Sequence, residues 1–162
     1  MAVALLIIFG GGYLFSGYFS DKGGNKRIEG ANKVPKFRKD ATLTFSKPSD
    51  STYSKVVDIE IADEEWEITQ GLMYRPSMAP NAGMLFIFDN MEPRSFWMRN
   101  TIIPLDILFI TDQKEIITIQ KHTVPYSEQS VPSYKPAQYV LELNAGFADE
   151  HNIKEGDFID WK

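Results

Sequence analysis

The stretch that decides the fold reads Phe96-Trp97-Met98-Arg99-Asn100-Thr101-Ile102-Ile103-Pro104-Leu105-Asp106-Ile107-Leu108-Phe109-Ile110. From Leu105 onward the residues predict a strand, and apolar side chains would point to both of its faces. A strand that is apolar on both faces is typical of the centre of a covered sheet. We therefore expect residues 105–111 to form a central strand.

Asp106 is the one charged residue of this predicted strand. An ionised carboxylate in an apolar layer is unfavourable unless it is hydrogen-bonded or paired. We expect Asp106 to meet Asn100, a backbone amide or an arginine. Pro104 predicts a bend just before this strand, and Asn100 lies at that bend.

Two interpretations of these polar residues stay open. In the first, Asn100, Thr101 and Asp106 form a polar staple that holds the corner between two strands. In the second, an aromatic wall and a few polar groups line a small pocket, as in many small-molecule sites. The candidate ligand-binding residues are Arg75, Arg94, Trp97, Asn100 and Asp106.

Further strands are expected on both sides of this stretch, because short apolar or alternating runs lie between turn residues. The expected strands cover residues 42–46, 55–62, 83–88, 96–99, 105–111, 115–121, 137–143 and 158–161. A turn is expected at residues 89–93, a short helix at 144–151, and a long proline-containing loop at 123–136.

A second helix is expected over residues 63–75, with Asp63 as its N-cap. Gly71 inside this helix indicates close contact with another part of the backbone. The apolar side chains that we expect to dock the helix on the sheet are Trp66, Ile68, Leu72 and Met73.

Four segments carry a resemblance to a known family. Gly71-Leu72-Met73-Tyr74-Arg75 and Gly83-Met84-Leu85-Phe86-Ile87-Phe88 precede the central stretch, and residues 139–146 and 155–158 follow it. Together they closely resemble the signature of domain of unknown function family 192, small envelope-associated or secreted proteins of bacteria and archaea. The resemblance spans about residues 55–161 and implies the family's fold, but it implies no activity.

Composition supports one β-rich domain. The chain has 162 residues, and aromatic residues, which favour strands, make up 13% of them. No long crossover helix is expected between the strands. We predict an all-β domain over residues 41–162, an antiparallel sandwich or barrel-like sheet of about seven to nine strands with two short helices.

The first 20 residues contain no charged side chain. About 20 apolar residues suffice to span a bilayer as a helix, so residues 1–20 are expected to be a signal anchor or signal peptide. Residues 21–40 are expected to be a flexible basic linker. We favour an uncleaved anchor that displays the domain outside the cytoplasm in the cell envelope, or export if the leader is cleaved.

Charge is distributed unevenly along the chain. Residues 1–39 hold seven Lys and Arg against two acids, whereas residues 40–162 hold 10 Lys and Arg against 20 acids, a net charge of −10. An acidic domain is repelled by phosphates, so we expect no nucleic-acid partner.

Few catalytic or metal-binding patterns are present. The chain has no cysteine and only two histidines, His122 and His151, so we expect no metal and no cofactor. Asp106 and Glu142 are weak candidates for a catalytic carboxylate pair.

Three functions therefore stay open. The leading interpretation is a non-enzymatic envelope module that binds a small polar ligand or a protein partner. The alternatives are an envelope carbohydrate hydrolase that uses paired carboxylates, and a purely structural interaction domain.

Overall fold

The computed structural model describes residues 35–162. The membrane segment predicted over residues 1–20 and most of the predicted linker lie outside this range. Among the helices of residues 35–162, none has the length and apolar character needed to cross a membrane.

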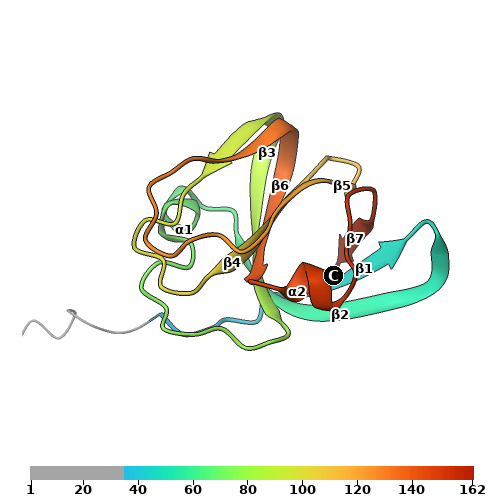
Figure 1. Ribbon diagram of the computed structural model, residues 1–162, viewed down its shortest axis with the longest axis horizontal. Coiled ribbons are helices and arrows are strands. Elements are labelled where there is room, and N and C mark those ends of the chain that lie inside the picture. The colour runs from blue at the N-terminus through green and yellow to red at the C-terminus, as the bar shows by residue number, and fades with distance from the viewer. Residues whose placement is uncertain (1–34) are drawn as a thin grey trace, which may run out of the picture. The chain divides into compact units, whose positions relative to one another are not determined.

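Seven strands and two short helices make up this part of the chain (Figure 1). In order they are β1 (Ala41–Lys47), β2 (Asp50–Ala62), α1 (Glu65–Gln70), β3 (Ala82–Phe96), β4 (Leu105–Ile110), β5 (Ile116–Gln120), β6 (Val131–Asn144), α2 (Phe147–Glu150) and β7 (Phe158–Trp161).

All seven strands belong to one sheet, in the order β5-β4-β6-β3-β2-β1-β7. The sheet curls into a half-barrel, and its two edge strands meet at one end through an antiparallel bridge between Glu115 and Phe158. The structure thus favours the barrel-like alternative over the sandwich. The sheet is also mixed, because β2 and β3 pair in parallel, and the expectation of a wholly antiparallel sheet was wrong there.

Apolar side chains cover the central strands on both faces, as predicted for residues 105–111. On one face Leu108 and Leu141 pack with residues of β1, β2, β7 and α2. On the other face Ile107 and Phe86 pack with Leu72, which follows α1. All six residues of β4 are buried, so β4 is a central strand in the sense that the sequence indicated.

Three strands run further than their sequence pattern indicated, and the first is β2, which begins at Asp50 instead of residue 55. The predicted turn at residues 89–93 is part of β3. The separate strand predicted over 96–99 was wrong, because Phe96 is the last residue of β3 and residues 97–99 lie in no strand. The predicted loop over 123–136 ends earlier, because β6 begins at Val131. The pairing of β3 with β6 shifts register between Ile87 and Glu92 and again beyond Pro93, and prolines are tolerated at such irregularities.

Helix α1 is shorter than predicted. Its N-cap is Glu64, with no capping hydrogen bond from a side chain, and its C-cap is Gly71 at φ +46°. A Cβ atom at Gly71 would lie 3.3 Å from the ring of Phe86, so the close neighbour of this glycine is a side chain and not the backbone that was predicted. The positive φ ends the helix, because side chains other than glycine disfavour it.

The last residues of the predicted linker are attached to the domain. Arg38 donates to Glu67 of α1 at 2.9 Å and to the carbonyl oxygen of Ile61 at 2.9 Å. Asp40 accepts from the backbone N–H of Ile61. Within the described residues, the ordered structure therefore begins before the predicted boundary at residue 41.

Candidate functional site

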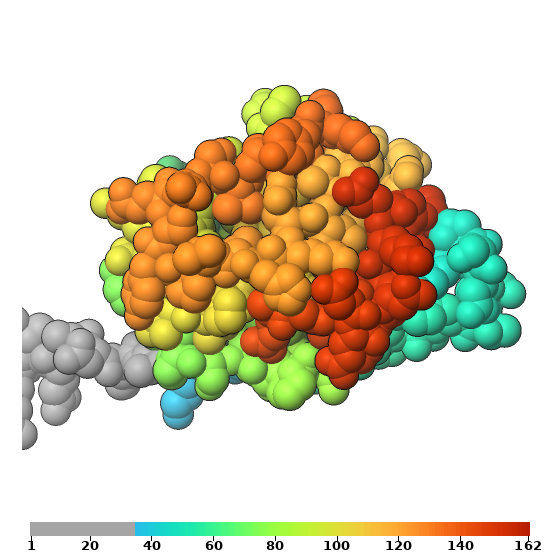
Figure 2. Space-filling model, in the orientation of Figure 1, coloured from blue at the N-terminus to red at the C-terminus, as the bar shows by residue number. Residues whose placement is uncertain are grey.

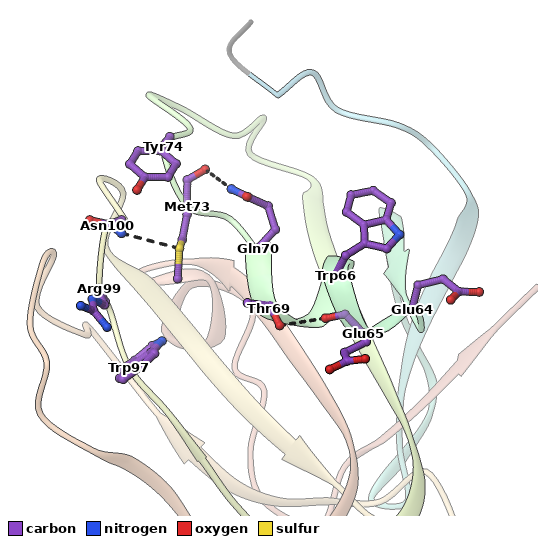
Figure 3. A pocket seen from close by; sticks show the side chains of 10 residues that line it. All are labelled: Glu64, Glu65, Trp66, Thr69, Gln70, Met73, Tyr74, Trp97, Arg99 and Asn100. Atoms are coloured by element: carbon purple, nitrogen blue, oxygen red, sulfur yellow. Dashed lines mark hydrogen bonds between the residues drawn. The ribbon is translucent and has the colours of Figure 1, made fainter. Parts of the chain in front are cut away.

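A groove lies between α1 and the segment that follows β3, and we call it the aromatic groove (Figure 3). Its volume is about 820 Å³, which is in the range of pockets that hold small molecules. The side of α1 supplies Glu64, Glu65, Trp66, Thr69 and Gln70. The opposite side and the upper end are formed by Met73, Tyr74, Trp97, Arg99 and Asn100.

Three large aromatic side chains in this groove face solvent. Trp66 is 66% exposed, Tyr74 55% and Trp97 49%. Trp66 was expected to dock α1 on the sheet, and that expectation was wrong, because Ile68 and Leu72 make that contact instead. Exposed aromatic side chains that gather around one concave surface are typical of binding sites.

Local backbone geometry holds the upper end of the groove. Tyr74 and Asn100 both have positive φ values, of 63° and 56°, which non-glycine residues rarely adopt. The backbone N–H of Tyr74 donates to the carbonyl oxygen of Asn100 at 2.9 Å, so the two unusual residues are joined. Such conformations cluster at functional sites.

The segment that carries Trp97 and Asn100 is braced from its other side. The backbone N–H of Met98 donates to Ser127, and that of Tyr126 donates to Thr101. Figure 2 shows the corresponding yellow and orange regions packed side by side on this face of the domain. The side of the groove that Trp97 forms is therefore supported by the loop between β5 and β6.

Arg99 and Trp97 lie together in the groove. The guanidinium carbon of Arg99 is 5.3 Å from the centre of a Trp97 ring, within the range of cation–π contacts. Arg99 also lies 3.4 Å from Glu128. Asn100 is close to Met73, with its amide nitrogen 3.9 Å from the sulfur atom.

A small cavity of about 40 Å³ lies next to the aromatic groove and shares Thr69, Gln70, Met73 and Trp97 with its lining. Glu142 of β6 also lines it and is only 5% exposed. Burial raises the pKa of Glu142 to about 8, although the charge of nearby Arg75 lowers it in part. The carboxyl group is therefore largely neutral at pH 7.

Arg75 belongs to a second pocket, of about 330 Å³, that also touches α1. Its guanidinium group forms a buried, two-pronged ion pair with Glu60, in which Nη2 and Oε2 are 2.7 Å apart. Glu60 and Glu142 flank Met84 in the sheet register, so all three face the same side as Arg75. The Nε atom of Arg75 is buried without a hydrogen-bond partner among the described residues.

Glu60 could not be recognised from the sequence as a site residue, because it alternates with apolar residues as an ordinary solvent-facing position would. Its burial depends on α1 and Arg75 covering that face of β2. A buried arginine, by contrast, needs a carboxylate partner, so the search for one is the signal that would have found Glu60.

Asp106 lies on the other face of the sheet and is completely buried. Its carboxylate accepts from the backbone N–H groups of His122, Gly146 and Ala148, each at 3.0 Å. The predicted backbone partner is confirmed, whereas within residues 35–162 neither Asn100 nor an arginine contacts this carboxylate. Through these bonds Asp106 attaches two segments to β4, namely the start of α2 and the start of the loop that follows β5.

Arg94 lies near the C-terminal end of β3. Its Nε donates to the carbonyl oxygen of Ala137 at 3.1 Å, its Nη2 bonds to Asn90, and it stacks 4.0 Å above the ring of Phe88. The bond to Ala137 links β3 to β6 near the register shift, whereas Asn90 and Phe88 belong to β3 itself.

The five predicted ligand-binding residues thus do not form one cluster. Trp97 and Asn100 line the aromatic groove, and Arg75 lies in the neighbouring pocket. Arg94 and Asp106 are used in separate contacts of the scaffold.

The candidate catalytic pair is excluded by register. Asp106 is opposite Leu143, and Glu142 is opposite Ile107, so the two carboxyl groups point to opposite faces of the sheet. They cannot flank one glycosidic bond. Residues 35–162 also contain no group of three or more His, Cys, Asp or Glu placed to hold a metal ion.

Sequence and structure comparisons place these features in a wider context. The profile of the DUF192 family, described as "Uncharacterized ACR", matches residues 46–161. No curated protein is significantly similar to this chain.

The crystal structures similar to this chain include proteins from two bacteria. One is a protein from Sinorhizobium meliloti 1021 described as a candidate transcription regulator, with 39% identity, a TM-score of 0.72, and coverage of 75% of this chain and 92% of that chain. The other is a protein of unknown function from Novosphingobium aromaticivorans DSM 12444, with 36% identity, a TM-score of 0.69, and coverage of 74% and 84%.

Proposed function

The chain belongs to the DUF192 family, and from that premise we propose that its folded part is a non-enzymatic module that binds a small polar ligand in the aromatic groove. The observation that carries this proposal is the exposure of Trp66, Tyr74 and Trp97 around one concave surface. Water contact with large aromatic rings is unfavourable, and a ligand that covers them would remove it.

The charged groups of the sheet support binding rather than catalysis. Both oxygens of Asp106 already accept backbone hydrogen bonds, and Glu142 points to the opposite face. The groove itself offers Glu64, Glu65 and Arg99 at exposed positions. Among the described residues we find no nucleophile with an adjacent base there.

Intrinsic fluorescence tests the proposal directly, because two of the three tryptophans line the groove. The full chain would be titrated with panels of sugars, short peptides, nucleotides and organic anions, and each hit would be checked by thermal unfolding. We expect a bound ligand to change the tryptophan emission and to raise Tm.

Two variants locate the binding site. Trp97→Ala should weaken binding of any hit by about tenfold or more, as truncation of a central aromatic contact commonly does. Tyr134→Ala is the matched control, because Tyr134 is an exposed aromatic residue outside the groove. Equal losses in both variants, or no hit from any class, would contradict the proposal.

We also propose that the module acts in the cell envelope, tethered through residues 1–20. Support comes from the sequence alone, since this segment has no charged side chain. Membrane fractionation of the full chain and of a variant with Leu5→Lys and Leu6→Lys tests this. The full chain should sediment with membranes, and the variant should not; recovery of both in the same fraction would contradict the tether.

Direct contact with nucleic acid would be opposed by the net charge of −10 over residues 40–162.

A further inference from the structure

The charges in the aromatic groove disfavour a strongly charged ligand. Glu64 and Glu65 lie on the side of α1, and Arg99 lies beside Trp97 on the other side. A cation that stacked on Trp97 would meet the guanidinium group of Arg99, whereas an anion would meet the two glutamates. A neutral ligand avoids both repulsions.

The polar groups of the groove both donate and accept hydrogen bonds. Gln70 and Asn100 carry amide groups, Thr69 carries a hydroxyl, and the glutamates and Arg99 add acceptors and donors. Such a mixture matches hydroxyl groups, each of which both donates and accepts. The exposed rings of Trp66 and Trp97 offer flat apolar surfaces against which C–H groups can pack.

The groove offers little to the backbone of an extended peptide. One wall is α1, and its backbone bonds internally from Ile68 to Glu64 and from Gly71 to Glu67. The opposite wall beyond Phe96 belongs to no strand of the sheet. Strand addition needs an open strand edge, and the groove does not provide one.

Glu142 adds a polar group below the groove. Its carboxyl lines the cavity beside Trp97 and makes no hydrogen bond to another described residue. In its neutral form a carboxylic acid both donates and accepts, like the hydroxyl groups that it would face.

We propose that the ligand of the aromatic groove is a neutral carbohydrate, whose apolar ring faces pack on Trp66 and Trp97 and whose hydroxyl groups bond to the polar side chains between them. This inference rests on the proposed function and names its ligand class.

The test uses the full chain in a mild detergent and isothermal titration calorimetry. The probes are two neutral trisaccharides, maltotriose and the trimer of N-acetylglucosamine, with a proline-rich decapeptide and choline as comparators. We expect at least one trisaccharide to bind, to lose about tenfold or more of its affinity in Trp97→Ala and in Trp66→Ala, and to keep it in Tyr134→Ala.

The outcomes separate this inference from the proposed function. Groove-dependent binding of the peptide or of choline, without either trisaccharide, would overturn the carbohydrate class and leave the binding function intact. Trisaccharide binding that is the same in Trp97→Ala and in wild type would overturn the assignment to this groove. Binding of no probe would overturn the carbohydrate class, and a hit from the wider fluorescence panel would then still support the groove.

Discussion

Asp106 and Glu142 are two buried carboxyl groups on neighbouring strands, and they have opposite environments. Asp106 is 0% exposed and accepts hydrogen bonds from three backbone amides. Glu142 is 5% exposed, has no hydrogen-bond partner among the described residues, and lines a small cavity. One residue of register separates them, because Asp106 faces the side of Leu143 and Glu142 faces the side of Ile107.

The difference shows how one sheet can carry two roles. On the face of Asp106, polar atoms are fully used in fixing loops, as in a structural staple. On the face of Glu142, Arg75 is paired with Glu60 alone, and its Nε has no partner among residues 35–162. Incompletely satisfied polar groups near a concave surface indicate a functional region.

The largest effect is expected from Asp106→Ala. The change leaves three backbone N–H groups without acceptors, and that of Ala148 is buried. Each hydrogen bond to a charged group contributes about 1.5–3 kcal/mol, but the N–H of the exposed residue His122 can bond to water instead, so the free energy of unfolding should fall by about 4 kcal/mol. Urea unfolding measures it, with the exposed Asp63→Ala as control. A stable variant that has lost ligand binding would favour the ligand role for Asp106 over the staple.

Arg75→Met should come next. It leaves Glu60 buried without its partner and should destabilise the domain by about 3 kcal/mol, as removal of one member of a buried pair commonly does. The double variant Glu60→Leu with Arg75→Met should recover part of this loss, and exposed Arg99→Met is the control. Equal free energies of unfolding in Arg75→Met and in the double variant would show that Arg75 and Glu60 do not stabilise each other.

Glu142 should produce a smaller effect that depends on pH. Its raised pKa of about 8 means that the folded state keeps a proton that the unfolded state releases above its ordinary pKa of 4.5. The contribution of Glu142 to stability should therefore be fully present below about pH 4.5 and be lost as pH rises to about 8. The free energy of unfolding can decrease by at most about 1.4 kcal/mol per pH unit. We expect a total decrease of about 2 kcal/mol, because water in the cavity can solvate part of the charge.

Urea unfolding of wild type and Glu142→Gln between pH 4 and 9 measures this dependence. The amide cannot ionise, so the difference between the two proteins should grow with pH in favour of the variant. A difference that stays constant from pH 4 to 9 would show that Glu142 does not titrate in this window.

Trp97→Ala should have the smallest effect on stability, within about 0.5 kcal/mol, because half of the side chain is exposed. Thermal unfolding measures it, with Phe96→Ala as the contrasting neighbour, since Phe96 is partly buried against the core. A loss as large as that of Phe96→Ala would make Trp97 a core residue rather than a wall of the groove.

Local pattern predicted most of the strands. Sequence alone predicted β4, the hairpin to β5 and the short strand β7, because each of these elements depends on residues that are close together in the chain. The extension of β3 through residues 89–93 was not, since its sequence contains turn formers and a proline. Pairing with β6 overrode those local preferences.

The candidate site was predicted only in part. Trp97 and Asn100 stood out because they lie in the family signature, and both line the groove. Trp66 and Tyr74 were missed as site residues because the groove is formed between segments about 30 residues apart. Glu60 was missed because an alternating strand does not tell which polar positions another element will cover.

The sequence by itself determined that this chain forms a β-rich domain of the DUF192 family and that Asp106 must be satisfied inside it. Both follow from local rules, namely strand periodicity and the unfavourable burial of an unpaired charge. Only the tertiary structure decided which backbone amides meet Asp106, that Glu142 faces the other way, and that Trp66 and Trp97 share one groove. Those facts depend on sheet register and on how α1 packs, which link residues that are distant in sequence.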